Sequence, residues 1–119
     1  ERCPNTPIII YMAPAKYSSG GRRLLQLAQS GADIVSVDHT VDISKAKQIL
    51  NGKVNIIQGN LDPQLLRDGP LEDIKEETER ILSKTKGIGH IMNLGHGILP
   101  DTPEEHAAFF VNTVKGYKK

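Results

Sequence analysis

Residues 31–63 have the sequence GADIVSVDHTVDISKAKQILNGKVNIIQGNLDP, in which two apolar runs lie on either side of an amphipathic stretch. The runs, at residues 34–37 and 54–57, are rich in Val and Ile, which favour strands buried on both faces. Between them, Asp42 is placed to cap a helix and Asn51-Gly52 to end it. The segment therefore predicts a strand–helix–strand unit whose strands run parallel.

The same alternation continues on both sides of this unit. Further strands are expected at residues 8–12 and 88–94, which are also largely apolar. The spacing of apolar residues predicts one helix around residues 24–28, after Ser18-Ser19, and another over residues 70–82. The chain therefore carries four candidate strands separated by helices.

The last helix is predicted to start at a capping box. Thr102 is placed as the N-cap, Pro103 as the first helical residue, and Glu105 as the side chain that bonds back. The complete order is then β-α-β-α-β-α-β-α, which predicts an α/β fold with parallel strands. Two architectures fit: a doubly wound open sheet, or half of a (β/α)8 barrel, since a whole barrel takes roughly 250 residues.

Composition narrows the classes of function. The chain has 119 residues, enough for one domain with a core. Its 15 basic and 14 acidic side chains leave a net charge of +1, and this near-balance gives no sign of the clustered basic face that binding to nucleic acid usually needs. No apolar run approaches the ~20 residues needed to span a bilayer, so no membrane contact is expected. The single cysteine, Cys3, excludes an internal disulfide, and the histidines lack the spacing of a zinc site. Because the first residue is Glu1 and not Met, we expect the chain to start partway through a longer parent.

Ligands of parallel α/β proteins bind at the carboxyl ends of the strands, so the residues after each strand are the candidates for a site. The strongest is His96, which lies between two glycines just beyond the last strand. Its imidazole can donate to a carboxylate or carbonyl group of a ligand. A loop histidine that bonds its own main chain fits the same spacing equally well. The candidate segments together are residues 13–17, 38–40, 59–63 and 93–97.

Other polar side chains near these ends are interpreted as structural. Asp38 could orient a donor group of a ligand or cap the next helix, and the structural role is favoured; Asp62 is placed at a helix start, and Asn60 lies in the same turn. Two glycines around His96 are too few for a dinucleotide fingerprint, and no serine or cysteine is placed as a nucleophile. Of the remaining histidines, His39 is interpreted as a surface residue, His90 as a packed residue of a strand, and His106 as a solvent-facing residue of a helix.

Three segments, in order, resemble motifs of the uroporphyrinogen decarboxylase family. Residues 93–105, NLGHGILPDTPEE, closely resemble its C-terminal signature. Residues 35–40, VSVDHT, resemble its Asp-Trp-Thr strand end, with His39 in place of the aromatic residue. Residues 58–63, QGNLDP, resemble its Gln-Gly-Asn-hydrophobic-Asp-Pro strand end. The resemblance spans nearly the whole chain, and three motifs in the right order make it specific.

The resemblance implies a fold and an activity. Members of the family are (β/α)8 barrels that act as homodimers in porphyrin biosynthesis, where they remove the four acetate carboxyl groups of uroporphyrinogen without metal or organic cofactor. Residues 1–119 would be the C-terminal half of such a barrel, and His96 would bind a carboxylate of the porphyrinogen. The family's pyrrole-contacting aspartate and arginine-rich segment belong to the absent N-terminal half, so no catalytic residue is expected here and the chain alone should be inactive. The implied compartment is the cytoplasm, or the plastid stroma in a photosynthetic eukaryote.

Three other functions are weighed against this one. Corrinoid-dependent methyltransferases have a related fold, but they hold zinc with a His-x-Cys pair and a later cysteine. Here the corresponding strand end reads Tyr11-Met12-Ala13-Pro14, and no cysteine follows Cys3. The alternative from a different class is a non-catalytic α/β binding or assembly module, and the third choice is a dinucleotide-binding domain.

Overall fold

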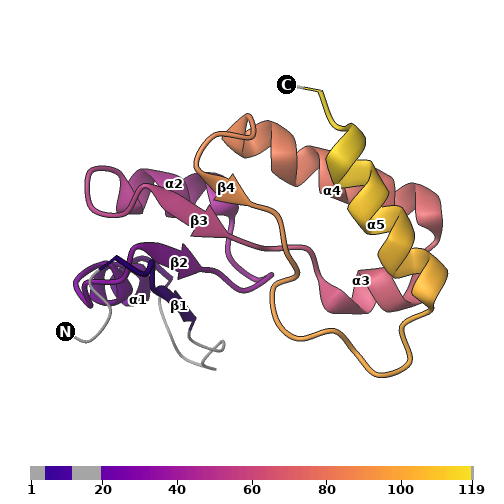
Figure 1. Cartoon of the computed structure of the whole chain (residues 1–119), viewed down its shortest axis with the longest axis horizontal. Coiled ribbons are helices and arrows are strands. Elements are labelled where there is room, and N and C mark those ends of the chain that lie inside the picture. Colours follow the sequence, from indigo (N-terminus) through magenta and orange to yellow (C-terminus); the bar gives the residue numbers. More distant parts are fainter. Residues whose placement is uncertain (1–4, 12–19, 119) are drawn as a thin grey trace.

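A computed structural model describes residues 5–11 and 20–118 of the chain (Figure 1). Strands and helices alternate along it, with one additional helix after the third strand. Met12, the candidate segment 13–17 and the Ser18-Ser19 helix start lie outside the described residues. The elements are, in chain order, β1 (Ile9–Tyr11), α1 (Gly20–Ala28), β2 (Ile34–Ser36), α2 (Ile43–Leu50), β3 (Ile56–Gln58), α3 (Pro63–Asp68), α4 (Leu71–Thr85), β4 (His90–Ile91) and α5 (Glu104–Gly116).

The strands form one sheet in the order β1-β2-β3-β4, and the parallel pairing that the sequence predicts is confirmed. Val35 pairs with Ile10 on one side and with Ile57 on the other, so the central residues of these three strands lie opposite one another. An isolated parallel bridge between Leu61 and Leu94 carries the pairing of β3 and β4 further toward the carboxyl ends. The carboxyl ends of the strands therefore lie at one edge of the sheet, where a site is expected.

The two faces of the sheet differ in what covers them. Side chains alternate between the faces along a strand, and the register places Ile10, Val35 and Ile57 on the same face. Val35 is 0% and Ile57 2% exposed, and both belong to the core. On the other face, Ile9 is 48% and Ile91 39% exposed. This second face, called the open face below, is exposed at its two edge strands, whereas Ile34 and Ser36 of the inner strand β2 are buried on it. In a barrel this face would line the interior.

The core lies between the covered face of the sheet and the helices. Helix α4 contributes Ile74 and Ile81, and α5 contributes Phe110. Leu61, which lies between β3 and α3, and Leu66 of α3 are almost completely buried in the same cluster. Burial of each such side chain stabilises the fold by about 2 kcal/mol. The apolar spacing that predicts a helix over residues 70–82 is confirmed, because the buried residues of α4 follow it. Among the described residues, no helix combines the length and apolar character that crossing a bilayer requires.

The predicted helix starts are confirmed for α2 and wrong for α5. Asp42 caps α2, where its side chain accepts a 2.9 Å hydrogen bond from the main-chain nitrogen of Ser44. Helix α5 begins at Glu104, directly after Pro103, with no side-chain cap. Thr102 lies one residue too early to serve as the cap, because Pro103 itself has an extended conformation. Within the described part of the chain, the hydroxyl oxygen of Thr102 is buried without a hydrogen-bond partner.

The sequence does not predict α3 as an element of its own; it places only a helix start at Asp62-Pro63. The structure confirms that start, since Asp62 accepts a 2.8 Å hydrogen bond from the main-chain nitrogen of Gln64. The helix then ends at Gly69, which has φ +69°, a conformation that glycine tolerates better than other residues. A helix of this length shows too few turns for apolar periodicity to reveal it.

Candidate functional site

The loop after β4 lies back across the carboxyl end of the sheet. Tyr11 belongs to the edge strand β1, and Gly95 follows the opposite edge strand β4. The Tyr11 hydroxyl nevertheless donates a 2.9 Å hydrogen bond to the carbonyl oxygen of Gly95. Figure 1 shows the long connection between β4 and α5 passing the ends of the strands before it reaches α5. Residues 95–97 are thereby placed over the strand ends where a ligand would bind.

Gly95 lies directly against His39, which follows β2. A Cβ atom added to Gly95 would overlap the main-chain nitrogen of His39 and would lie 2.7 Å from its Cβ and 2.8 Å from its Cα. Only glycine permits this approach, which explains the first glycine of the Gly-His-Gly motif. The loops after β2 and β4 are therefore in direct main-chain contact at the candidate site.

His96 is exposed at the surface of this loop. Its Nδ1 atom lies 2.8 Å from the carbonyl oxygen of Gly97. A carbonyl oxygen only accepts, so Nδ1 carries the hydrogen and Nε2 is the nitrogen left for a ligand. The main-chain bond expected of an ordinary loop histidine is thus present, but it engages one nitrogen only. Both interpretations of His96 from the sequence are compatible with this geometry.

His39 lies beside His96, and the interpretation of His39 as a surface residue is wrong. The centroids of the two rings are 5.3 Å apart, and the ring planes meet at 69°, an edge-on arrangement. His39 is half-buried, and its Nδ1 atom is buried with no hydrogen-bond partner among the described residues. The local sequence gives no sign of this contact, because the two histidines are brought together by the sheet.

The polar residues interpreted as structural do hold the loops in place. Asp38 is 8% exposed and accepts a 2.8 Å hydrogen bond from the main-chain nitrogen of Thr40, as well as one from its hydroxyl. The buried side-chain amide of Asn60 donates to the carbonyl oxygens of Asp38, at 2.9 Å, and of Val41, at 2.6 Å. Asp62 caps α3 as expected. The expectation that Asp38 caps the next helix is wrong, because Asp42 caps α2 and Asp38 instead orders its own loop, which is a structural role all the same.

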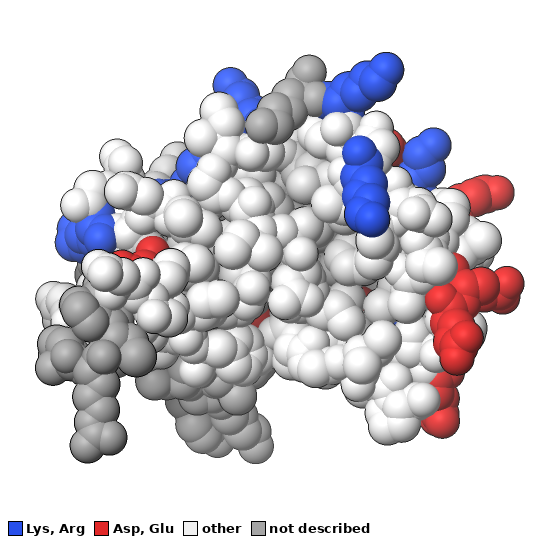
Figure 2. Space-filling model, viewed as in Figure 1, with Lys and Arg blue, Asp and Glu red and all other residues white. Residues whose placement is uncertain are grey.

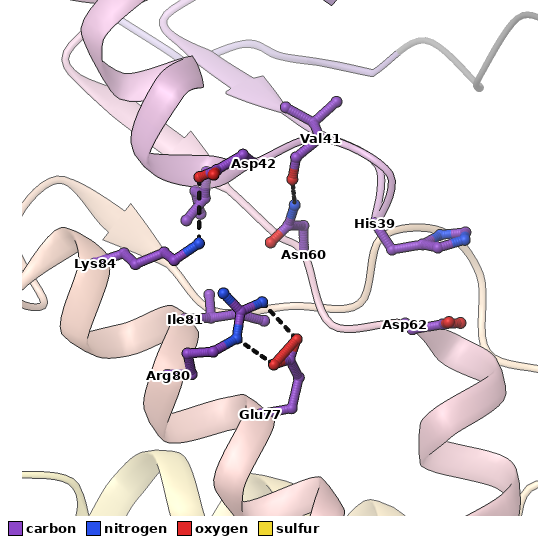
Figure 3. Close-up of a pocket in the computed structure, with 10 residues that line it drawn as sticks. His39, Val41, Asp42, Asn60, Asp62, Glu77, Arg80, Ile81 and Lys84 are labelled. Carbon is purple, nitrogen blue, oxygen red and sulfur yellow. Dashed lines mark hydrogen bonds and ion pairs between the residues drawn. The ribbon is translucent and has the colours of Figure 1, made fainter.

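A polar cavity of about 170 Å³ adjoins these loops on the side of α4 (Figure 3). Figure 3 shows His39 and Asp62 at one end of it and Lys84 at the other. Its lining residues are His39, Val41, Asp42, Ile43, Asn60, Asp62, Glu77, Arg80, Ile81 and Lys84.

The cations of this cavity are already paired. Arg80 donates two hydrogen bonds to the carboxylate of Glu77, one of them at 2.7 Å, and Lys84 lies 3.3 Å from Asp42. The hydrogen bond from Arg80 lowers the pKa of Glu77. The pKa of Asp42 is held far below its ordinary range, mainly by hydrogen bonds from Ser44 and to a smaller extent by Lys84. A charged ligand would have to displace these partners. The strand-end loops are therefore the better candidate site.

The two remaining histidines are structural. In β4, Nε2 of His90 lies 2.6 Å from the carbonyl oxygen of Gly59, and Nδ1 lies 2.8 Å from the hydroxyl of Thr85, so the prediction of a packed histidine is confirmed. The solvent-facing interpretation of His106 is wrong, because its Nδ1 donates to the carbonyl oxygen of Leu66 at 2.7 Å and joins α5 to α3.

Charge is spread unevenly over the surface. Figure 2 shows basic side chains toward the upper and left margins of one face and acidic side chains along the right margin. The middle of that face is uncharged. Over residues 5–11 and 20–118, no three or more His, Cys, Asp or Glu side chains are grouped closely enough to hold a metal ion.

Known proteins match almost the whole chain. A family model described as uroporphyrinogen decarboxylase (URO-D) covers residues 1–117. The curated uroporphyrinogen decarboxylase from Gloeobacter violaceus is 46% identical to this chain, over 94% of this chain and 30% of the relative. The one from Prochlorococcus marinus is 48% identical, over 92% of this chain and 30% of the relative. The relative from Microcystis aeruginosa is 42% identical over 98% of this chain and 31% of its own length. The chain thus spans about 30% of the length of these relatives.

The fold has a solved counterpart. A methyltransferase from Methanosarcina mazei superimposes with a TM-score of 0.78 over 93% of this chain and 31% of that protein, at 24% identity. At this identity the match shows the fold alone. It agrees with the parallel α/β arrangement of the structure and with the prediction of a partial barrel. The resemblance found in the sequence is confirmed by the family match: the chain belongs to the uroporphyrinogen decarboxylase family.

Proposed function

We propose that this chain is part of a uroporphyrinogen decarboxylase, a carboxy-lyase that converts the acetate side chains of uroporphyrinogen to methyl groups and yields coproporphyrinogen. The observation that carries the proposal is 42–48% identity to curated enzymes of that name across nearly all of the chain. Because the chain spans about 30% of their length, the activity is proposed for the natural polypeptide that carries residues 1–119. These residues would form the C-terminal half of its barrel.

His96 is the residue that we assign to substrate binding. Its exposed ring uses Nδ1 as a donor to Gly97, which leaves Nε2 for the substrate. A carboxylate only accepts hydrogen bonds, so the imidazolium form, which carries a hydrogen on Nε2 as well, is the form that binds it. Such a charge-assisted hydrogen bond is roughly twice as strong as a neutral one.

The reaction needs orientation and charge stabilisation more than reactive side chains. Protonation of a pyrrole ring carbon gives a cation that can accept the electron pair of the bond between the acetate methylene and its carboxyl group. That bond breaks, carbon dioxide leaves, and the methylene carbon then takes a proton while the ring carbon loses its own. The protein holds the ring and stabilises the cation as it develops. In this scheme His96 anchors a carboxylate that is not reacting.

The test uses the natural polypeptide that carries residues 1–119, incubated anaerobically with uroporphyrinogen while the products are followed by mass spectrometry. We expect stepwise loss of carbon dioxide. His96→Ala should lower kcat/KM about tenfold to a hundredfold, the range for loss of a hydrogen bond to a charged group. The matched control is Ile98→Ala, which changes an exposed residue of the same loop and should leave the rate unchanged.

The outcomes separate the parts of the proposal. Stepwise loss that is insensitive to His96→Ala would keep the enzyme but remove His96 from the substrate site. No loss from a folded wild-type protein would overturn the decarboxylase assignment and favour a non-catalytic α/β binding module.

A further inference from the structure

The ring of His96 has a second contact besides its bond to Gly97. His39, from the loop after β2, meets it edge-on, with 5.3 Å between the ring centroids and 69° between the planes. Edge-on aromatic pairs at this separation are attractive and have a preferred geometry. His96 is thus limited in rotation from two sides, by a hydrogen bond at one ring nitrogen and by a neighbouring ring.

The main chain that carries His96 is fixed against the same residue. Gly95 is buried and lies too close to the main chain of His39 for any side chain. The hydroxyl of Tyr11 donates to the carbonyl oxygen of Gly95 from the opposite edge of the sheet, at 2.9 Å. The backbone before His96 is therefore held by β1 and by the loop after β2, and the His39 ring continues this support out to the side chain.

We propose that His39 is a positioning residue: its ring holds the His96 imidazole in the orientation that presents Nε2 to the carboxylates of an acidic substrate. The proposal rests on the function proposed above and adds to it how the site is shaped. His39 acts through His96 and has no separate contact with the substrate in this scheme.

The environment of His39 indicates that the shape of its ring matters, and not its nitrogen. Its Nδ1 is buried, and over the described residues it has no hydrogen-bond partner. A buried nitrogen without a partner destabilises the fold, whereas a ring carbon at that place would not. Phe keeps a ring of similar size and removes this nitrogen, so His39→Phe should retain the support that His39→Ala removes.

The kinetic test combines single and double variants of the natural polypeptide that carries residues 1–119. With uroporphyrinogen as the probe, His39→Ala should lower kcat/KM about two- to tenfold, in line with the strength of an aromatic pair. His39→Phe should recover most of this loss. In the His96→Ala background, His39→Ala should have no further effect, because a positioning residue has nothing left to position. Thermal unfolding of each variant shows whether it is folded.

A second readout does not depend on activity. In protein labelled with ¹³C in the histidine rings, His39→Ala should shift the ring proton resonances of His96, and His39→Phe should shift them less. The ring resonances of His90, which is held by Gly59 and Thr85, should stay in place and exclude a general loss of structure.

Three results would overturn the proposal. The first is an equal loss of kcat/KM from His39→Ala in the wild-type and in the His96→Ala background. The others are a folded His39→Phe variant that does not recover activity, and His96 resonances that do not shift in His39→Ala. If the wild-type protein shows no decarboxylation, the proposed function fails. The resonance shifts then still decide whether His39 supports His96.

Discussion

The side-chain amide of Asn60 donates a 2.9 Å hydrogen bond to the main-chain carbonyl oxygen of Asp38. A second bond from the same nitrogen reaches the carbonyl oxygen of Val41 at 2.6 Å. Asn60 follows β3, and its two partners are in the loop after β2, which also carries His39. One buried side chain therefore ties together two of the loops that form the candidate site.

We predict that Asn60→Ala will lower the free energy of unfolding by about 1–3 kcal/mol, because the carbonyl oxygen of Val41 loses this donor and that of Asp38 keeps only its bond from the main-chain nitrogen of Val41. Urea unfolding of the variant and the wild type measures the difference. Asn112→Ala, on the exposed side of α5, is the matched control and should stay within about 0.5 kcal/mol of the wild type. Equal effects from the two substitutions would show that the Asn60 bonds do not stabilise the loops.

His90 should make stability depend on pH. Burial lowers its pKa below the ordinary 6.5, and the opposing effect of the bond to Gly59 is smaller. The unfolded chain takes up a proton near pH 6.5, whereas the folded chain does so only at lower pH. The unfolded state thus binds more protons in this window, so the free energy of unfolding is highest above pH 6.5 and falls as the pH drops below it.

His90→Gln isolates this contribution, because Gln can donate to Gly59 but does not titrate. Urea unfolding above and below pH 6.5 should show a smaller loss of stability at the lower pH for the variant than for the wild type. Comparing the two proteins cancels the contribution of the other histidines. Identical pH dependence in both would contradict the neutral, buried state of His90.

Asp42 should stabilise α2 mainly as a cap and only weakly as an ion-pair partner. Asp42→Ala should cost about 1 kcal/mol through loss of the bond to Ser44, whereas Asp42→Asn keeps an oxygen that accepts it and should cost less. Lys84→Ala, which removes only the partly exposed ion pair, should cost less than about 1 kcal/mol. Because folding lowers the pKa of Asp42, the carboxylate contributes fully to the free energy of unfolding above pH 3.8, and this contribution is lost as the pH falls below that value. A larger effect of Lys84→Ala than of Asp42→Ala, in thermal unfolding, would reverse the assignment.

Much of the fold follows from local sequence signals. The β-branched runs predict strands because Val and Ile favour strands. Asp42 and Asp62 predict helix starts because their bonds reach two residues along the chain. The same local rule fails at Thr102, since the conformation of Pro103 shifts the start of α5 by one residue. For α3 the rule gives the start but not the end, which comes at Gly69, where the chain takes a positive φ.

The site could be predicted only in part. His96 is singled out as a candidate from its place between two glycines after a strand, which is a local pattern. Its neighbour His39, the Tyr11 bond to Gly95, and the bond of His106 to Leu66 all join segments that are distant in the chain. Such contacts depend on strand order and loop paths. No spacing within either segment encodes them, so the sequence assigns His39 and His106 wrongly to the surface.

The sheet leaves apolar side chains uncovered at both of its edges. Strands β1 and β4 are the outer strands of the described sheet, and Ile9 and Ile91, on its open face, are 48% and 39% exposed. Outer strands with unpaired main-chain groups and apolar side chains pair readily with other chains. We therefore predict that residues 1–119, when produced alone, will self-associate as the concentration is raised.

Lysine on an edge strand opposes such pairing, so Ile9→Lys and Ile91→Lys should each shift the equilibrium toward the monomer, measured by analytical ultracentrifugation or light scattering. Val111→Lys is the matched control, because Val111 is 46% exposed on α5, away from the sheet, and the charge change is the same. Association that responds equally to all three substitutions would reflect net charge and not the sheet edges. A wild-type chain that stays monomeric, with well-dispersed amide resonances, would show that the uncovered edges do not pair.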